Sequence, residues 1–298
     1  MSKQWIGIDA GSSSTKWAIV DEVGDLILEG VSGPVDGHIY RPESTLRMES
    51  FLKELKDKCS KDVVGIYAGV TGASDQPEEN SAIKALLLKH FPDSQISVDI
   101  DVALGYRANF NEDRGIYLYA GTGSIAIYID QDRKLRANGG WGYLLGDEGA
   151  GYWIGREALR QLLGEIESGK NISRIKEILN GKLAIINRSE ILKYAYVNSR
   201  EDIARLAKPL IELAIQGDSS AKEITKISAQ HLSELVLRTE ENAGLKNARI
   251  VFGGGVAQSG AIITSEIERI LGRKVEVSKE NLSLDAAKLA LLNLRSTS

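Results

Sequence analysis

Short apolar runs of strand length alternate along this chain with longer stretches in which apolar residues recur at helical spacing. Phe51, Leu52 and Leu55, for example, fall on one face of a predicted helix. In the first third the pattern predicts strands at 4–8, 15–20, 25–29, 63–67 and 96–98, and helices at 43–59, 78–90 and 101–110. Strands and helices that alternate in this way predict α/β architecture, with helices on both faces of a sheet.

The same succession of elements restarts near residue 115. Strands are predicted at 115–120, 124–130 and 134–136, followed by a glycine-dense segment, four or five helices, a strand at 249–252, a helix at 259–271, a strand at 274–277 and a final helix at 283–294. At 298 residues the chain exceeds one typical core. We therefore predict an N-terminal domain over 1–110 and a larger C-terminal domain over 111–298, and leave open whether the last helix packs on the first domain.

Two hairpin tips, 110 residues apart, follow one design. The first is the run Asp9-Ala10-Gly11-Ser12-Ser13-Ser14-Thr15-Lys16, and the second is Ala120-Gly121-Thr122-Gly123-Ser124. Each lies between two apolar strands, and its small side chains would let backbone N–H groups approach an anion closely. One such loop alone is equally typical of an ordinary β-hairpin with a polar tip. Two of them favour a site that holds a polyphosphate from both sides.

The two loops differ at one position that bears on metal binding. Asp9 ends the first strand, whereas Tyr119 stands at the matching position of the second copy. Because Mg²⁺ prefers carboxylate, water and phosphate oxygens, we expect only the first loop to handle a metal, through Asp9. A third glycine run, Gly253-Gly254-Gly255, lies between a strand and a helix. It suits close approach by a flat ring or a phosphate, and equally a tight strand-to-helix turn.

Two acids follow the strand predicted at 96–98. Asp101 would stand at the end of that strand, where a carboxylate can accept a proton from a substrate hydroxyl, as a kinase base does. Asp99 is the competing candidate, and either residue could instead be a helix N-cap. Their spacing of two places both acids on one face of the strand if the strand continues.

The glycine-dense segment over 139–157 is the most specific feature of the chain. Seven glycines lie between residues 139 and 155, and they predict a tightly wound loop that can contact a ligand. The carboxylates within it can accept hydrogen bonds from several hydroxyls, as a site for a sugar requires. Trp153 is expected in the core. The candidate sugar-binding residues of this segment are Trp141, Gly142, Gly146, Asp147 and Glu148.

Composition narrows the class of protein. A formal charge of −4 and a pI near 5.6 argue against general nucleic-acid binding, which needs a basic surface. No apolar run approaches the roughly 20 residues of a membrane span, and a strand begins by Trp5, which leaves no room for a signal peptide. Cys59 is the only cysteine, so an internal disulfide is excluded and a reducing cytoplasm is favoured. The three histidines show no metal-binding spacing.

Residues 139–157 resemble the signature of the N-acetylglucosamine kinases and their BadF/BcrA-type ATPase relatives, in the superfamily of sugar kinases, actin and heat-shock chaperones. The loops at Asp9 and Gly121 resemble that superfamily's two phosphate motifs, and the run from Gly253 resembles its adenosine motif. The resemblance implies ATP in a cleft between two ribonuclease-H-like domains, the actin-like ATPase fold, with Mg²⁺ near Asp9. It also implies that Asp101 is the catalytic base and contacts the sugar, and that Asp147 binds sugar hydroxyls.

Two features depart from the family pattern. Where the family usually carries an asparagine that contacts the sugar, this chain has Asp36, which we expect at the same place. An acid there would favour an amine-bearing sugar such as glucosamine over an acetamide. The dehydratase-activator branch of the family carries an iron–sulfur cluster, which one cysteine per chain cannot ligate.

We therefore predict a cytoplasmic kinase that uses ATP and Mg²⁺ to phosphorylate a hexosamine, N-acetylglucosamine or glucosamine, at O6. One rival is a BadF-type ATPase that acts as a conformational switch on another protein, which basal hydrolysis without sugar would favour. A second is a non-catalytic sugar sensor, against which the presence of Asp9 and Asp101 argues. The expected ligand is a small amino sugar, with neither nucleic acid nor membrane, and a homodimer is left open.

Overall fold

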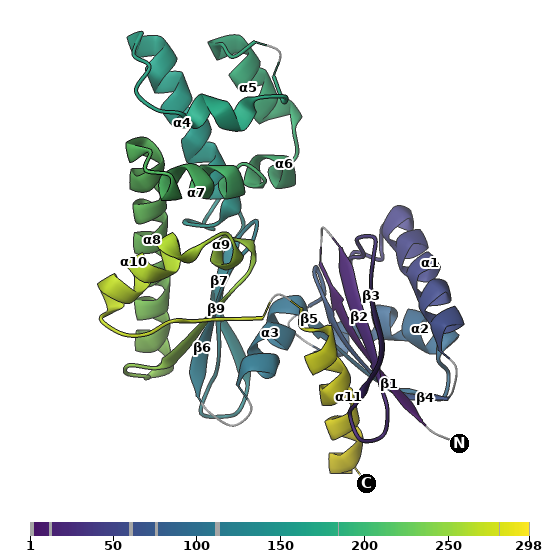
Figure 1. Ribbon diagram of the computed structural model, residues 1–298. Coiled ribbons are helices and arrows are strands. Elements are labelled where there is room, and N and C mark those ends of the chain that lie inside the picture. Colours follow the sequence, from purple (N-terminus) through teal and green to yellow (C-terminus); the bar gives the residue numbers. More distant parts are fainter. Residues whose placement is uncertain are drawn as a thin grey trace. The chain divides into compact units, whose positions relative to one another are not determined.

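The computed structural model describes residues 3–11, 14–59, 62–74, 77–110, 114–183, 185–279 and 281–297, without the side chains of 77, 78 and 293–297. The chain divides into two compact units. The first unit joins Met1–Glu112 to the C-terminal segment Asn281–Ser298, and the second is Asp113–Glu280. The final helix therefore belongs to the first unit, although it lies at the other end of the sequence (Figure 1).

The first unit is built on one five-stranded sheet in the order β3-β2-β1-β4-β5. Strands β1, β2 and β3 form an antiparallel meander, and β4 and β5 run parallel to β1. The strands are β1 (Gln4–Ala10), β2 (Thr15–Val20), β3 (Leu26–Ser32), β4 (Val63–Val70) and β5 (Gln95–Ile100). The helices are α1 (Pro42–Lys58), the 3-10 helix η1 (Pro77–Asn80), α2 (Ser81–His90), α3 (Asp101–Asn109) and α11 (Ser283–Thr297).

Helices cover both faces of this sheet, because alternate strand residues point to opposite sides. On one face, Ile6 and Ile8 of β1 pack in a core with Phe51 and Leu52 of α1. On the other face, the next strand residues pack with Leu104 of α3 and with the apolar side of α11. Different helices thus bury the two faces of the sheet, so a site is expected at the loops along its carboxyl edge.

The second unit repeats the same sheet topology with the order β10-β9-β6-β7-β8. Here β6, β7 and β8 form the antiparallel meander, and β9 and β10 run parallel to β6. The strands are β6 (Gly115–Ala120), β7 (Ser124–Ile129), β8 (Leu135–Gly139), β9 (Arg249–Gly253) and β10 (Glu276–Val277). The two halves share one topology, as the repeated hairpin pattern in the sequence indicates.

The helices of the second unit enclose one large core. Helix α8 runs along the sheet, whereas α4 to α7 gather at one end of the unit (Figure 1). Trp153 is buried in this core, as predicted. The helices are α4 (Gly151–Ser168), η2 (Ile175–Leu179), α5 (Arg188–Val197), α6 (Arg200–Ala204), α7 (Ala207–Ile215), α8 (Ser219–Ala243), α9 (Gly255–Gln258) and α10 (Ala261–Leu271).

Most predicted elements are present, with local differences in their ends. The helix predicted at 259–271 is α10, which begins at Ala261 after the backbone turns at Gly260, where φ is 140°. The short helix α9, which precedes this turn, was not predicted. The strand predicted at 4–8 extends to Ala10, so Asp9 lies inside β1.

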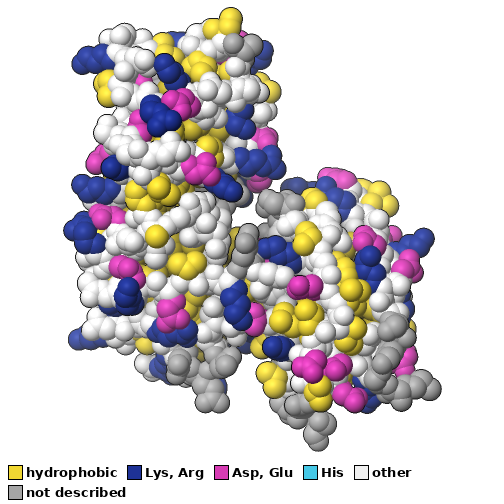
Figure 2. Space-filling view, viewed as in Figure 1, with side chains coloured by type: hydrophobic (Ala, Val, Ile, Leu, Met, Phe, Trp, Pro, Cys, Tyr) yellow, Lys and Arg dark blue, Asp and Glu magenta, His cyan; other side chains and the backbone are white. Residues whose placement is uncertain are grey.

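Over the described residues, no helix is both long and apolar enough to span a bilayer. Figure 2 shows side chains of both charge signs interspersed over the visible face, so no one sign dominates it.

Candidate active site

Three polar residues of the first unit meet at the carboxyl edge of its parallel strands. The register places Ala10, Val70 and Ile100 side by side in β1, β4 and β5. Thr71 and Asp101 directly follow Val70 and Ile100, and Asp9 directly precedes Ala10. The Thr71 backbone N–H donates to the carbonyl of Ala10 across 2.9 Å, which fixes this edge. The arrangement gathers two carboxyls and a hydroxyl contributed by segments that lie far apart in sequence.

The carboxyl of Asp101 is held in a setting that suits a proton acceptor. Burial, followed by the charge of Asp9, raises the pKa of Asp101 to about 6. The backbone N–H of Val102 donates to Asp101 Oδ1 across 2.9 Å, and the Thr71 hydroxyl also binds this carboxyl; both bonds favour the ionised form. A base whose pKa lies slightly below neutral is mostly ionised at pH 7 and still accepts a proton readily.

Asp99 is a structural residue, and the structure separates it from Asp101. The hydroxyl of Tyr67 donates a short hydrogen bond to Asp99 Oδ2, and Arg107 Nε donates to the same oxygen across 3.0 Å. The strand also ends at Ile100, so Asp101 begins α3 instead of continuing the strand. The two acids therefore do not share a strand face, and Asp99 is committed to pairing within the first unit.

The first loop is closed by its own backbone. The N–H of Gly11 donates to the carbonyl of Ser14 across 3.0 Å, and Asp9 faces Lys16 across the β1–β2 ladder. Thr15 is fully buried, and its hydroxyl has no partner among the described residues. The predicted ligands Ser12 and Ser13 lie outside the described residues.

Asp9 has the chemistry of a magnesium ligand. Burial raises its pKa, while Lys16 and the backbone N–H of Leu282 act in the opposite direction. No cluster of three or more acidic, histidine or cysteine side chains suited to a metal occurs in the described parts of the chain. Mg²⁺ in phosphoryl-transfer sites commonly takes one or two carboxylates and completes its shell with water and substrate phosphates. Asp9 would supply one such carboxylate to Mg²⁺. Water and the phosphates of ATP would supply the remaining oxygen ligands.

Both carboxylate oxygens of Asp36 already accept hydrogen bonds from protein groups, which argues against contact with a sugar. Its Oδ1 accepts from the backbone N–H of His38 across 3.0 Å and lies 3.1 Å from His38 Nδ1. Its Oδ2 accepts from Ser44 Oγ across 3.2 Å and from Arg47 Nη2 across 2.7 Å. Although burial opposes ionisation, these bonds together lower the pKa of Asp36. Both oxygens are used to join the loop after β3 to the start of α1, so a sugar hydroxyl would have to displace a protein donor.

The second loop is held by the first turn of α4. The Gly121 N–H donates to the Gly123 carbonyl across 3.0 Å and closes the hairpin. The N–H groups of Gly151 and Tyr152 then donate to the carbonyls of Gly121 and Thr122, across 2.8 and 3.1 Å. Helix N–H groups at a first turn lack intrahelical acceptors, so these bonds satisfy them and fix the loop.

Asp147 connects the glycine-dense segment to this loop. The backbone N–H of Ser124 donates to Asp147 Oδ1 across 3.2 Å, and Arg200 Nη1 lies 3.9 Å from Oδ2. Burial raises the pKa of Asp147, and these two interactions oppose it. A Cβ at position 123 would lie 2.4 Å from Asp147 Oδ2, so a larger residue there would require this carboxyl to move. Asp147 therefore contacts the second hairpin loop directly, which its position in the sequence does not indicate.

The third glycine run also reaches the second loop. Gly254 has a φ of 93°, and a Cβ there would lie 2.4 Å from the carbonyl oxygen of Ala120. Gly253 ends β9, and Gly255 begins α9, a helix of four residues. The second unit therefore brings together the three glycine-rich segments singled out in the sequence, although they are spread over more than a hundred residues.

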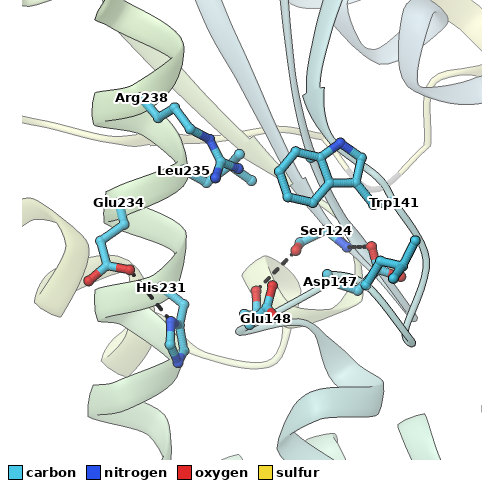
Figure 3. Close-up of a pocket in the computed structure, with 11 residues that line it drawn as sticks. Ser124, Trp141, Asp147, Glu148, His231, Glu234, Leu235 and Arg238 are labelled. Carbon is cyan, nitrogen blue, oxygen red and sulfur yellow. Dashed lines mark hydrogen bonds and ion pairs between the residues drawn. The ribbon is translucent and has the colours of Figure 1, made fainter.

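A cavity of about 330 Å³ lies between the glycine-dense segment and helix α8 (Figure 3). Ser124 Oγ donates to the Glu148 carbonyl across 3.0 Å and joins the second loop to the cavity wall. Trp141 is exposed to 58%, so it is not a core residue. Gly142 lies just outside, in the tight turn before Tyr143. The cavity is lined by Trp141, Gly146, Asp147 and Glu148 from the segment, and by His231, Glu234 and Arg238 from α8.

Sequence reasoning missed several residues of these two regions. Thr71 could have been found by treating every strand end at the carboxyl edge alike, since it follows β4 as Asp101 follows β5. His231, Glu234 and Arg238 recur at helical spacing on α8, which marks a shared polar face but no known motif. Arg200 carries no local signal, because only the folded chain brings it to Asp147.

Curated proteins match this chain over most of its length. The chain is 26% identical over 281 residues to an N-acetylmuramic acid/N-acetylglucosamine kinase of Clostridium acetobutylicum, covering 90% of each protein. It is 25% identical over 305 residues to an N-acetyl-D-glucosamine kinase of Dictyostelium discoideum, covering 95% of this chain and 94% of the relative.

Solved structures share the fold. A crystal structure from Chromobacterium violaceum, described as a candidate N-acetylglucosamine kinase, matches with a TM-score of 0.77 and 18% identity, over 97% of this chain and 98% of that one. The prediction of two ribonuclease-H-like α/β domains of the sugar-kinase and actin type is thereby confirmed. A sequence profile of one family matches residues 6–283, nearly the whole chain. The chain belongs to the BadF/BadG/BcrA/BcrD ATPase family.

Proposed function

We propose that this protein is an ATP-dependent kinase that transfers the γ-phosphoryl group of ATP to a hexosamine. The observation that carries the proposal is the setting of Asp101: a carboxyl at the edge of three parallel strands, beside Asp9, with its pKa raised to about 6. The curated relatives named as amino-sugar kinases match over nine-tenths of the chain or more. N-acetylglucosamine or glucosamine is the expected acceptor, with O6 the attacking oxygen.

In this reaction Asp101 accepts the proton of the sugar hydroxyl as its oxygen bonds to the γ-phosphorus and ADP leaves. Backbone N–H groups of the loops at Gly11 and Gly121 would bind phosphate oxygens, and the run at Gly253 would approach the adenosine. Asp9 would hold Mg²⁺ together with the phosphates, and the ion would supply positive charge that stabilises the transferred group. Trp141, Asp147 and Glu148 would bind the sugar, in a cavity near the lower end of the roughly 300–1,000 Å³ typical of ligand sites.

The test is a coupled assay of ADP release against a panel of hexoses and amino sugars, with the product identified by mass spectrometry. We expect ADP release that depends on an amino sugar and a product heavier by one phosphate group. Glucose and galactose serve as controls that lack the nitrogen substituent. The proposal fails if no sugar in the panel is phosphorylated.

The family name supports one other activity, ATP hydrolysis. In this alternative, hydrolysis would drive a conformational change in another protein. Such an ATPase would hydrolyse ATP at the same rate with and without amino sugars. Stimulation of ADP release by a hexosamine, with matching sugar phosphate, separates the kinase from the switch. A reducing cytoplasm is the proposed location, in keeping with the single free thiol of Cys59.

A further inference from the structure

Arg238 lines the cavity beside Trp141 and is not paired with an acidic side chain. Its guanidinium carbon lies 4.9 Å from the centroid of the Trp141 ring. Among the described residues, no carboxylate lies within ion-pair distance of Arg238. Glu234, one turn earlier on α8, lies 3.6 Å from His231 Nδ1 instead. Figure 3 shows the guanidinium directed toward Trp141 and the cavity.

The cavity is lined by carboxylates on both sides and by Arg238. Asp147 and Glu148 come from the glycine-dense segment, and the facing helix α8 contributes Glu234 together with Arg238 (Figure 3). The second arginine near this segment, Arg200, lies beside the Asp147 carboxylate and over the ring of Tyr143. Carboxylates suit the hydroxyls of a sugar, because a carboxylate oxygen accepts the hydrogen bond that a hydroxyl donates. Arg238 suits an anion, so the cavity matches a polyhydroxylated ligand with one negative group.

Arg238 is also prepared for such a contact. Stacking on an indole ring orients the planar guanidinium and leaves its N–H fork free to bind a carboxylate in two places. An arginine held in this way loses less side-chain entropy when it binds than a freely rotating one. The Trp141 ring, exposed to 58%, thus both covers the ligand site and orients its cation.

We propose that the cavity accepts an amino sugar that carries a carboxylate substituent, and that Arg238 is the residue that selects for it. This inference rests on the proposed hexosamine kinase activity. A relevant sugar is N-acetylmuramic acid, which is N-acetylglucosamine with a lactic acid joined to O3 by an ether bond. The Clostridium relative is named for both of these sugars, which differ only by that acidic group.

The test compares both sugars in the wild-type protein and in Arg238→Gln. We expect the wild type to phosphorylate both sugars. In Arg238→Gln, the ratio of kcat/KM for N-acetylmuramic acid to that for N-acetylglucosamine should fall at least tenfold, because charge-assisted, bidentate bonds are lost. Arg238→Lys keeps the charge and should recover part of the ratio. Arg269→Gln, on α10 and paired with Glu266, is an exposed arginine outside the cavity and should leave the ratio unchanged.

Two further measurements distinguish a charge contact from a structural role. Binding of N-acetylmuramic acid, measured by calorimetry without ATP, should weaken with added salt more than binding of N-acetylglucosamine, because salt screens an exposed ion pair. N-acetylglucosamine 6-phosphate tests the other anion that such an arginine could bind. If Arg238→Gln weakens only the binding of this phosphorylated sugar, the arginine binds a phosphate group and the inference is wrong.

Other outcomes also decide the matter. If the wild type phosphorylates N-acetylglucosamine but not N-acetylmuramic acid, the inference is overturned while the proposed kinase activity stands. If Arg238→Gln impairs both sugars equally, Arg238 positions the Trp141 loop and does not read charge. If no amino sugar is phosphorylated at all, the kinase proposal fails and this inference fails with it.

Discussion

Asp147 and Ser124 are joined by a hydrogen bond from the Ser124 backbone N–H to Asp147 Oδ1, 3.2 Å long and buried. This bond links a residue proposed to bind the sugar to a loop proposed to bind phosphate. From its sequence motif alone, Asp147 would be expected to affect only the sugar. The contact indicates instead that the two proposed binding regions of the second unit share one carboxylate.

The first prediction separates those two functions with two substitutions at one position. Asp147→Asn keeps an oxygen that can accept from Ser124 N–H, whereas Asp147→Ala removes it. We expect both variants to raise the KM for the sugar more than tenfold, since a hydrogen bond to a charged group contributes about 1.5–3 kcal/mol and about 1.4 kcal/mol is a factor of ten. Only Asp147→Ala should also weaken a non-hydrolysable ATP analogue, measured by calorimetry.

Glu148→Gln is the control for this pair. Glu148 is exposed, and its link to Ser124 runs through its backbone carbonyl, which the substitution keeps. The Gln variant should therefore leave nucleotide affinity close to that of the wild type. If Asp147→Ala is folded and binds the analogue normally, the bond to Ser124 does not support the phosphate loop.

The second prediction concerns Gly123, at the tip of the second loop. A methyl group at this position would lie 2.4 Å from Asp147 Oδ2, so the carboxyl must move. We expect Gly123→Ala to weaken the ATP analogue and the sugar together, with little change in the circular dichroism spectrum. Gly164→Ala is the control, because nothing lies within 4 Å of a Cβ there, on an exposed helix position. Normal affinity for both ligands in Gly123→Ala would contradict the proposed role of this loop.

The third prediction tests the proposed base. Asp101→Asn cannot accept the proton of the sugar hydroxyl, and loss of a general base typically costs about 10²–10⁴-fold in rate. Turnover should fall by that factor while the ATP analogue still binds. Asp99→Asn is the matched control, because Asp99 is paired with Tyr67 and Arg107 and should affect turnover much less. Near-normal turnover in Asp101→Asn would assign the base to another residue.

Much of the fold could be predicted because strand and helix periods are local properties of the sequence. The meander over 4–32 and its repeat over 115–139 were both visible in alternating apolar runs. The place of the last helix could not be predicted, because its apolar face would suit either sheet. Only the packing of Ala286 and Ala287 against the first unit decides it.

The candidate site was predicted less completely, for physical reasons. Asp9 and Asp101 were found because they stand one residue before and one residue after the end of a strand, and strand ends are readable from the pattern. Asp36 was placed by analogy with a family motif, and its pairing with Ser44 and Arg47 depends on how the loop meets α1. The residues of α8 that face the cavity have no signal of their own, because a polar helix face is normally only solvated.

The fourth prediction is the pH dependence of turnover. The pKa of Asp101 is raised to about 6, and a general base must be unprotonated to act. The value of kcat/KM for the sugar should therefore be constant above about pH 7 and fall tenfold per unit of pH well below 6. Binding of Mg·ATP, measured over the same range, separates this effect from protonation of the nucleotide. A profile that stays flat down to pH 5 would show that Asp101 does not titrate as the base.

The last prediction follows from the same raised pKa and concerns stability. An aspartate has a pKa near 3.9 in an unfolded chain, so the folded state of this protein binds the Asp101 proton more tightly. Stability is then lost as pH rises from about 4 to about 6, and the ionised carboxyl costs about 1–3 kcal/mol above that range.

Asp101→Asn should remove this cost. Its Tm, measured without nucleotide, should exceed that of the wild type by a few degrees at pH 7.5, and the gain should vanish near pH 4. Asp99→Asn should have the opposite sign at pH 7.5, because it breaks the ion pair with Arg107 at 3.0 Å. If both variants lose stability at pH 7.5, the fold stabilises the ionised Asp101 carboxyl, and its pKa is not raised.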